Sequence, residues 1–237
     1  MPIRRYSENS LKTYKLFGIS LYQQKYLELP LNGRQQFSPR SLFSRAGLRN
    51  VNTPYVSQVP CSWGAVYFPE HWREFHDYLS LRLTETVMTL DTEVVPGVRS
   101  NFWSKSWKRF YIELVYLRGY VMLYPNYEDF LSLSTNHLEV GSHVKVRSKE
   151  KRNLFLLPLV PLSEPQGPCK LLDMPDQTLP DFDALPVLNL IGSITTFDEI
   201  SVDGEVRRLH LLNCTHAAHV YNVKSLMCIT VPLGAGD

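Results

Sequence analysis

SWKRFYIELVYLRGYVMLYP, residues 106–125, is the stretch of sequence that decides the fold class. Apolar side chains recur in it at helical spacing and also occupy a second face, so we expect a well-buried helix over residues 106–118. Gly119 is a natural end for this helix. The apolar run 120–124 then predicts a strand that Pro125 stops. A helix, a glycine, an apolar strand and a proline in this order predict an α/β architecture.

The segment upstream predicts a second, amphipathic helix that starts at about Glu70. Its apolar positions recur at helical spacing, and its polar positions lie on the other side. The apolar positions are Trp72, Phe75, Leu79 and Leu83, and the polar ones are Arg73, Glu74, Asp77 and Thr84. Pro69 suits a first helical position, where its missing N–H costs nothing.

Shorter elements precede this helix. The apolar run 17–22 predicts a buried strand, and residues 55–59 and 63–68 predict two extended segments that Pro60 separates. The polar stretch 32–50, which contains several arginines, predicts a loop with one helical turn.

The character of the chain changes after about residue 150. Residues 158–186 are rich in proline and acidic side chains and predict an extended connection. Further strands are expected at 187–191 and around 208–212 and 226–231. The expected organisation is therefore one domain over 1–150, followed by a Pro-rich extended tail with C-terminal strands over 151–237.

Composition excludes several classes of protein. With 237 residues, 44% hydrophobic and 20% charged, the chain is expected to be globular. The basic run from Lys145 to Arg152 lacks interleaved aromatic residues, so we expect no nucleic-acid partner. No apolar stretch reaches the roughly 18–20 residues that span a bilayer, and the first residues lack the apolar core of a signal peptide.

The cysteines leave the redox state open. Cys61, Cys169, Cys214 and Cys228 form no C-x-x-C pair, and three pairings are possible besides free thiols. Asn213-Cys-Thr215 fits the short N-glycosylation pattern and counts towards a lumenal location.

Three blocks of the first half resemble a known family. The blocks SQVPCSWGAVYFPEHWREF, SWKRFYIELVYLRGYVMLYPN and STNHLEVGSH resemble the C-terminal half of fungal and plant glycosyltransferase-like proteins of the family 2 type. The resemblance covers roughly residues 16–144. It implies a nucleotide-diphosphosugar transferase (GT-A-like) fold and a setting in the secretory pathway, in the Golgi lumen or membrane. It also implies a nucleotide-sugar donor and a glycan or protein acceptor.

The chain departs from this family in one respect. Such a transferase is expected to have an N-terminal nucleotide-binding half, with an Asp-x-Asp motif after an apolar strand. Nothing before Leu16 can serve as that half, and Asp181-Phe182-Asp183 has no apolar strand ahead of it. We therefore expect a partial GT-A-like domain, the acceptor side of a transferase, as a fragment or a shortened paralogue.

Glu70 is the candidate catalytic residue, because inverting sugar transfer needs a carboxylate that takes the proton of the acceptor hydroxyl. The alternative is a carboxylate that the helix dipole favours in the first turn. Trp63, next to Gly64 at a turn, is the candidate platform for stacking a sugar, with Ser62 and His71 as further substrate-binding residues. Trp72 falls on the apolar stripe and is expected in the core.

His137, Glu139 and His143 are the candidate metal ligands. In an extended segment His137 and Glu139 share a face, and imidazole with carboxylate suits a divalent metal, here Mn²⁺ or Mg²⁺. The resemblance adds that a late histidine often completes the metal site of sugar-nucleotide transferases. The alternative is a loop with hydrogen-bonding histidines.

Three functions remain open at this stage. The first is transfer of a sugar from a nucleotide-sugar donor to a glycan or protein acceptor. The second is a non-catalytic module, derived from a transferase, that binds carbohydrate or a partner. The third is a structural metalloprotein built on His137, Glu139 and His143.

Overall fold

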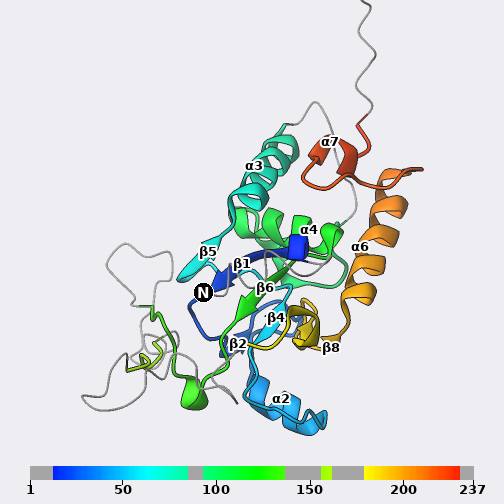
Figure 1. Cartoon of the computed structure of the whole chain (residues 1–237). Helices are drawn as coiled ribbons and strands as arrows, with labels where there is room; N and C mark the ends of the chain where they lie inside the picture. The colour runs from blue at the N-terminus through cyan, green and yellow to red at the C-terminus, as the bar shows by residue number, and fades with distance from the viewer. Residues whose placement is uncertain (1–12, 85–92, 137–155, 162–178, 230–237) are drawn as a thin grey trace, which may run out of the picture.

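A six-stranded mixed sheet forms the centre of the protein (Figure 1). The structure, a computed structural model, describes residues 13–84, 93–136, 156–161 and 179–229. The sheet has the order β5-β1-β6-β4-β7-β8. Its strands are β1 (Leu16–Ser20), β4 (Tyr55–Ser57), β5 (Ala65–Tyr67), β6 (Val121–Tyr124), β7 (Val187–Leu188) and β8 (Ile194–Thr195). A separate ribbon pairs β2 (Tyr26–Leu27) with β3 (Gln35–Gln36).

The sheet is mixed because parallel and antiparallel pairs alternate across it. β1 is parallel to β6 and antiparallel to β5, whereas β4 is antiparallel to β6 and parallel to β7. β7 and β8 form an antiparallel pair at the far edge. The fold is therefore α/β, as the sequence predicts at this coarse level.

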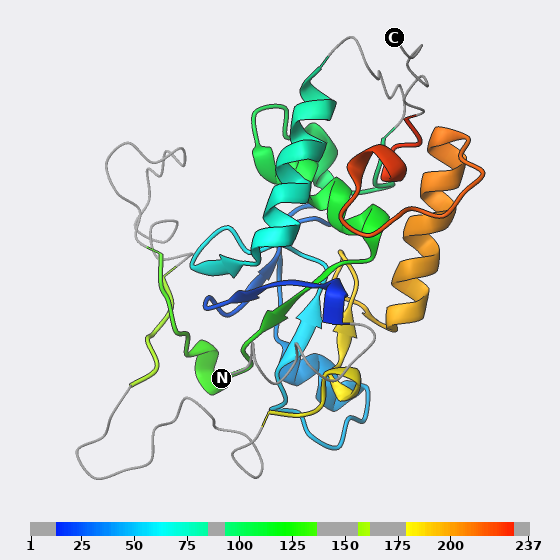
Figure 2. The same cartoon turned by 45° about the horizontal axis from the view of Figure 1, so that its top comes forward.

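Helices cover the sheet unevenly. The main ones are α2 (Pro39–Arg45), α3 (Pro69–Leu83), α4 (Trp107–Arg118), α6 (Phe197–Leu212) and the short α7 (Val223–Leu226). α4 packs against both α3 and α6, and α7 contacts α3 (Figure 2). α2 lies at the opposite end of the molecule from α3 (Figure 1).

Side chains of the central strands alternate between two apolar clusters, because successive residues of a strand point to opposite faces. In β6, Met122 and Tyr124 join the larger cluster with α3 and α4, while Val121 and Leu123 join a smaller one on the other face. The smaller cluster includes Phe197 at the start of α6. Both faces of the sheet are thus buried.

The region that decides the fold class forms as predicted. α4 runs over Trp107–Arg118 and is buried along most of its length. Gly119 ends it in the left-handed conformation, with φ +60°. β6 follows at once and is completely buried.

The buried face of α3 is shifted by about one residue from the face that the sequence predicts. The helix buries His71, Glu74, Phe75 and Tyr78, whereas Trp72 is 43% exposed and Leu83 is 63% exposed. Glu74, expected on the polar side, is 1% exposed because Arg118 and Tyr120 bind its carboxylate. Trp72 accordingly lies at the edge of the core instead of inside it.

The C-terminal part also differs from the extended tail that the sequence predicts. Residues 208–212, expected as a strand, lie in the 16-residue helix α6. A capping box starts this helix: Thr196 accepts from the N–H of Glu199, whose carboxylate accepts from the N–H of Thr196. β7 and β8 join the same sheet as β4, so the sheet contains strands from both sides of the boundary expected at residue 150.

One of the cysteine pairings left open is present. Cys214 and Cys228 form a disulfide that joins the end of α6 to the residues after α7. Cys61 is a buried free thiol, and Cys169 lies outside the described residues. Asn213, the glycosylation candidate, is exposed at the end of α6.

Gly204 allows α6 to approach α4 closely, and a larger residue at this position should destabilise the protein. A Cβ at this position would lie 2.3 Å from the Tyr116 carbonyl oxygen and 2.8 Å from that of Leu117. Gly204→Ala should therefore lower the free energy of unfolding by about 1–3 kcal/mol, although the same change in an exposed helix raises it by about 1 kcal/mol. Denaturant unfolding measures the difference.

Val206→Ala is the matched control, because Val206 lies on the same helix with its side chain 59% exposed. It should change the free energy of unfolding by less than about 0.5 kcal/mol. A Gly204→Ala variant that is more stable than the parent protein would contradict the close packing of α4 and α6.

Candidate functional site

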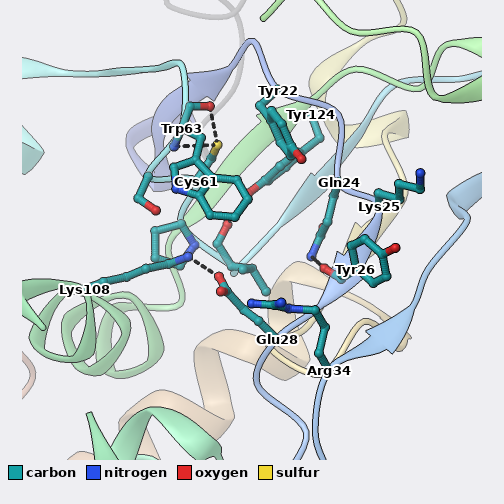
Figure 3. A pocket seen from close by; sticks show the side chains of 13 residues that line it. Tyr22, Gln24, Lys25, Tyr26, Glu28, Arg34, Cys61, Trp63, Lys108 and Tyr124 are labelled. Atoms are coloured by element: carbon teal, nitrogen blue, oxygen red, sulfur yellow. Dashed lines mark hydrogen bonds and ion pairs between the residues drawn. The ribbon is translucent and has the colours of Figure 1, made fainter. Parts of the chain in front are cut away.

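The candidate site is a small cleft of about 50 Å³ (Figure 3). Most of its lining comes from the segment around β2, from the turn between β4 and β5 and from the first turn of α4, and Arg34 and Tyr124 complete it. Tyr22, Glu28, Arg34, Ser62, Trp63 and Lys108 carry its chemistry. A space of this size holds a few water molecules, so a larger ligand would contact it at the mouth.

Trp63 forms one wall of the cleft. Pro60 ends the extended run after β4, and Gly64, with φ +67°, makes the turn into β5. The Leu21 N–H donates to the Gly64 carbonyl at 2.7 Å and anchors this turn to the end of β1. The half-buried Trp63 indole meets the Tyr22 ring edge to face, with centroids 5.3 Å apart.

Charged side chains form the opposite wall. Lys108, in the first turn of α4, forms an ion pair with Glu28, which follows β2. The two side chains are 10% and 22% exposed, so the pair is largely shielded from solvent and screened less than a surface pair. Arg34 lines the same cleft from beside β3 (Figure 3). The cleft therefore combines an aromatic surface with charged hydrogen-bonding groups.

Cys61 and Tyr22 stay in their neutral forms in this cleft. Burial raises the pKa of the Cys61 thiol and the pKa of the Tyr22 phenol. The Cys61 thiol donates to the Trp63 carbonyl at 3.0 Å. Because a thiolate and not a thiol is the nucleophile, Cys61 supports the turn and is not suited to covalent catalysis.

Two of the predicted site residues line the cleft and two do not. Ser62 and Trp63 lie in it, whereas Glu70 and His71 are at the other end of β5. The Glu70 side chain is 51% exposed and pairs with Arg73 at 3.2 Å. The structure thus gives Glu70 the surroundings of a first-turn carboxylate, away from Trp63.

His71 is a buried residue of the helical layer. Its Nε2 lies 2.8 Å from the Tyr14 carbonyl oxygen, and its ring packs edge to face on Tyr120 and Tyr221. Its Nδ1 is buried, with no hydrogen-bond partner among the described residues. Burial lowers the pKa of His71 below its ordinary value, so the ring is neutral at pH 7.

The predicted metal ligands cannot be placed. His137, Glu139 and His143 lie outside the described residues, so Mn²⁺ or Mg²⁺ binding there stays a prediction. Within the described ranges, no group of three His, Cys, Asp or Glu side chains could hold a metal ion. Asp181 precedes the short 3₁₀ turn Phe182–Ala184, which contains Asp183. In the same ranges, no helix has the length and apolar character needed to cross a bilayer.

Glu28, Arg34 and Lys108 were missed by sequence reasoning. Glu28 and Lys108 are 80 residues apart and lie on different elements. No local motif connects them. The pair becomes visible only when the packing of α4 against the ribbon of β2 and β3 is known.

Comparison with known proteins adds one partial match. Residues 38–88 match the family model described as the SPBC1E8.03c C-terminal domain. The matched region contains the turn with Trp63 and all of α3, and it covers less than a quarter of the chain. No curated protein and no solved structure matches the chain.

The buried His71 predicts how stability depends on pH. Its pKa is lower in the folded than in the unfolded protein, so the unfolded chain binds more protons below about pH 6.5. The free energy of unfolding should therefore fall as the pH decreases from about 7 to about 5. Denaturant unfolding at both pH values should show a smaller decrease for His71→Gln than for the parent protein.

His76→Gln serves as the control, because His76 has a side chain that is 77% exposed on the same helix. Its pH dependence should equal that of the parent. If the His71→Gln and His76→Gln variants lose stability with pH to the same extent as the parent, His71 is not the group that titrates.

Proposed function

We propose that this chain is a carbohydrate-binding module of the glycosyltransferase-like type, and that a glycan binds at the mouth of the cleft. One observation carries the proposal: the Trp63 indole and the Glu28–Lys108 ion pair border the same cleft. The C–H face of a pyranose packs on an indole, and its hydroxyls need charged or polar partners close by. Ser62, which is exposed next to Trp63, adds a hydroxyl group.

Binding without turnover fits this cleft better than sugar transfer. Pockets that enclose a small molecule have volumes of roughly 300–1,000 Å³, whereas the cleft has about 50 Å³. This favours contact with one sugar ring over enclosure of a nucleotide-sugar. The separation of Glu70 from Trp63 also leaves the cleft without the carboxylate that was expected to act as the base.

Sugar transfer is the second candidate function, and the position of Glu28 in the cleft favours it. Glu28 is the carboxylate that lies in the cleft with Trp63. It forms an ion pair with Lys108, and a carboxylate in this position can accept a proton from an acceptor hydroxyl. The GT-A-like fold, the nucleotide-sugar donor, the divalent metal and the secretory-pathway location belong to this second candidate and rest on the resemblance.

Glycan binding is tested with a change at Trp63. Isothermal titration calorimetry with short oligosaccharides of glucose, mannose and N-acetylglucosamine should detect binding of at least one of them. Trp63→Ala should weaken that binding by about 2 kcal/mol, or roughly 30-fold, because the stacking surface is lost. Trp72→Ala is the control, since Trp72 is a partly exposed tryptophan outside the cleft. Equal effects of the two changes, or no binding to any oligosaccharide, would refute the proposal.

Sugar transfer is tested separately with nucleotide-sugars and manganese. If the chain transfers or hydrolyses them, Glu28→Gln should reduce the rate by at least about 100-fold, as expected for loss of a general base. Glu70→Gln should leave the rate nearly unchanged. Turnover that depends on Glu70 and not on Glu28 would restore the role first expected for Glu70.

A further inference from the structure

A second, larger hollow lies beside α2, on the other side of the ribbon of β2 and β3 from the cleft. This groove has a volume of about 600 Å³, within the range of small-molecule sites. One face of α2 and its N-cap residue line the groove at helical spacing, with Ser38, Ser41, Leu42 and Arg45. The remaining walls come from Lys25, from β3, from Phe130 and from Gly192 in the turn between β7 and β8.

The charges of the groove have one sign. Lys25 and Arg45 enter it from different elements, and no carboxylate is among its lining residues. Within the described part of the chain, neither cation has an ion-pair partner, although Lys25 lies 5.4 Å from the centre of the Phe130 ring. Glu128 and Asp129 precede Phe130 in the sequence but do not line the groove. An anion in the groove would meet two cations with no competing carboxylate in its lining.

The sequence around α2 extends this bias. Between Glu28 and Glu70 there is no aspartate or glutamate, whereas there are four arginines, Arg34, Arg40, Arg45 and Arg49. This segment of the chain therefore carries an excess of positive charge, although the net charge of the whole chain is only +2. This bias attracts anions to the face that holds the groove.

The neutral groups of the groove suit an anion with several acceptor oxygens. Ser38 and Ser41 offer hydroxyls that can donate, and Gln36 offers an exposed amide. Leu27, Leu42 and Phe130 supply apolar surface next to these donors. The volume exceeds that of a single phosphate ion, so the fitting ligand carries an organic part beside the anionic group.

The geometry points to a binding site for a phosphate ester in this groove, with Lys25 and Arg45 as its charged ligands. Arginine and lysine both pair strongly with phosphate oxygens, and the two side chains reach the ligand from separate elements. Neither Trp63 nor Lys108 lines the groove, and Lys25 is the residue that the groove shares with the lining of the cleft. The ester can be a soluble metabolite or the headgroup of a lipid.

Titration of the whole chain with inorganic pyrophosphate, followed by calorimetry at low ionic strength, tests the site. The parent protein should bind, and the double variant Lys25→Gln/Arg45→Gln should bind at least about tenfold more weakly. Arg49→Gln is the matched control, because Arg49 is an exposed arginine close to α2 that does not line the groove. It should retain the affinity of the parent, as should Trp63→Ala.

Flotation with phosphatidylcholine vesicles, with or without phosphatidic acid, distinguishes the two sources of the ester. Binding of pyrophosphate alone indicates a soluble ligand, and binding that requires phosphatidic acid indicates a lipid headgroup, provided that the double variant loses it. The proposal is overturned if the parent binds neither probe. It is also overturned if Arg49→Gln and the double variant weaken binding equally, or if the double variant retains it.

Discussion

Two buried carboxylates, Glu74 on α3 and Glu113 on α4, fix how these helices pack. The Glu113 carboxylate accepts from Tyr78 and Arg82 of α3, each at 2.9 Å, and its side chain is 2% exposed. The Glu74 carboxylate accepts from Arg118 at 2.9 Å and from Tyr120 at 2.6 Å, and its side chain is completely buried. A buried carboxylate is tolerated only when it is paired and hydrogen-bonded. The helices therefore cannot slide or rotate against each other without leaving a buried charge unpaired.

The candidate cleft depends on this packing. Lys108 belongs to the first turn of α4, and Trp63 belongs to the turn that leads through β5 into α3. The ionic contacts that hold α3 on α4 therefore also set the distance between the charged and the aromatic walls of the cleft. The groove proposed to bind a phosphate ester uses α2 instead. α2 does not pack against α3 or α4 as closely as these two helices pack against each other. The two proposed sites thus share Lys25 and the ribbon of β2 and β3, but only the cleft includes a side chain of α4.

The elements that the sequence predicts well are those that local signals determine. α4, Gly119 and β6 follow from a periodic apolar pattern and a glycine. α6 was not predicted, since a strand was expected around residues 208–212, although Thr196 and Glu199 form a capping box at its start. The buried face of α3 could not be predicted in the same way, because Glu74 finds its partners 44 and 46 residues away. Two residues of the cleft, Trp63 and Ser62, could be predicted, because they lie at a turn that contains a glycine. Glu28 and Lys108 could not, because they come together only through tertiary packing. Pairing of side chains across 80 residues leaves no trace in local periodicity.

The free energy of unfolding of Glu113→Gln tests the role of the buried carboxylates most directly. Removing this charge leaves Arg82, whose side chain is 9% exposed, without its ionic partner. We expect a loss of about 3–5 kcal/mol in denaturant unfolding. The corresponding change at Glu70, which has a 51% exposed side chain and pairs with Arg73, should cost less than about 1 kcal/mol. Similar small losses for the two variants would contradict the view that Glu113 holds α3 on α4.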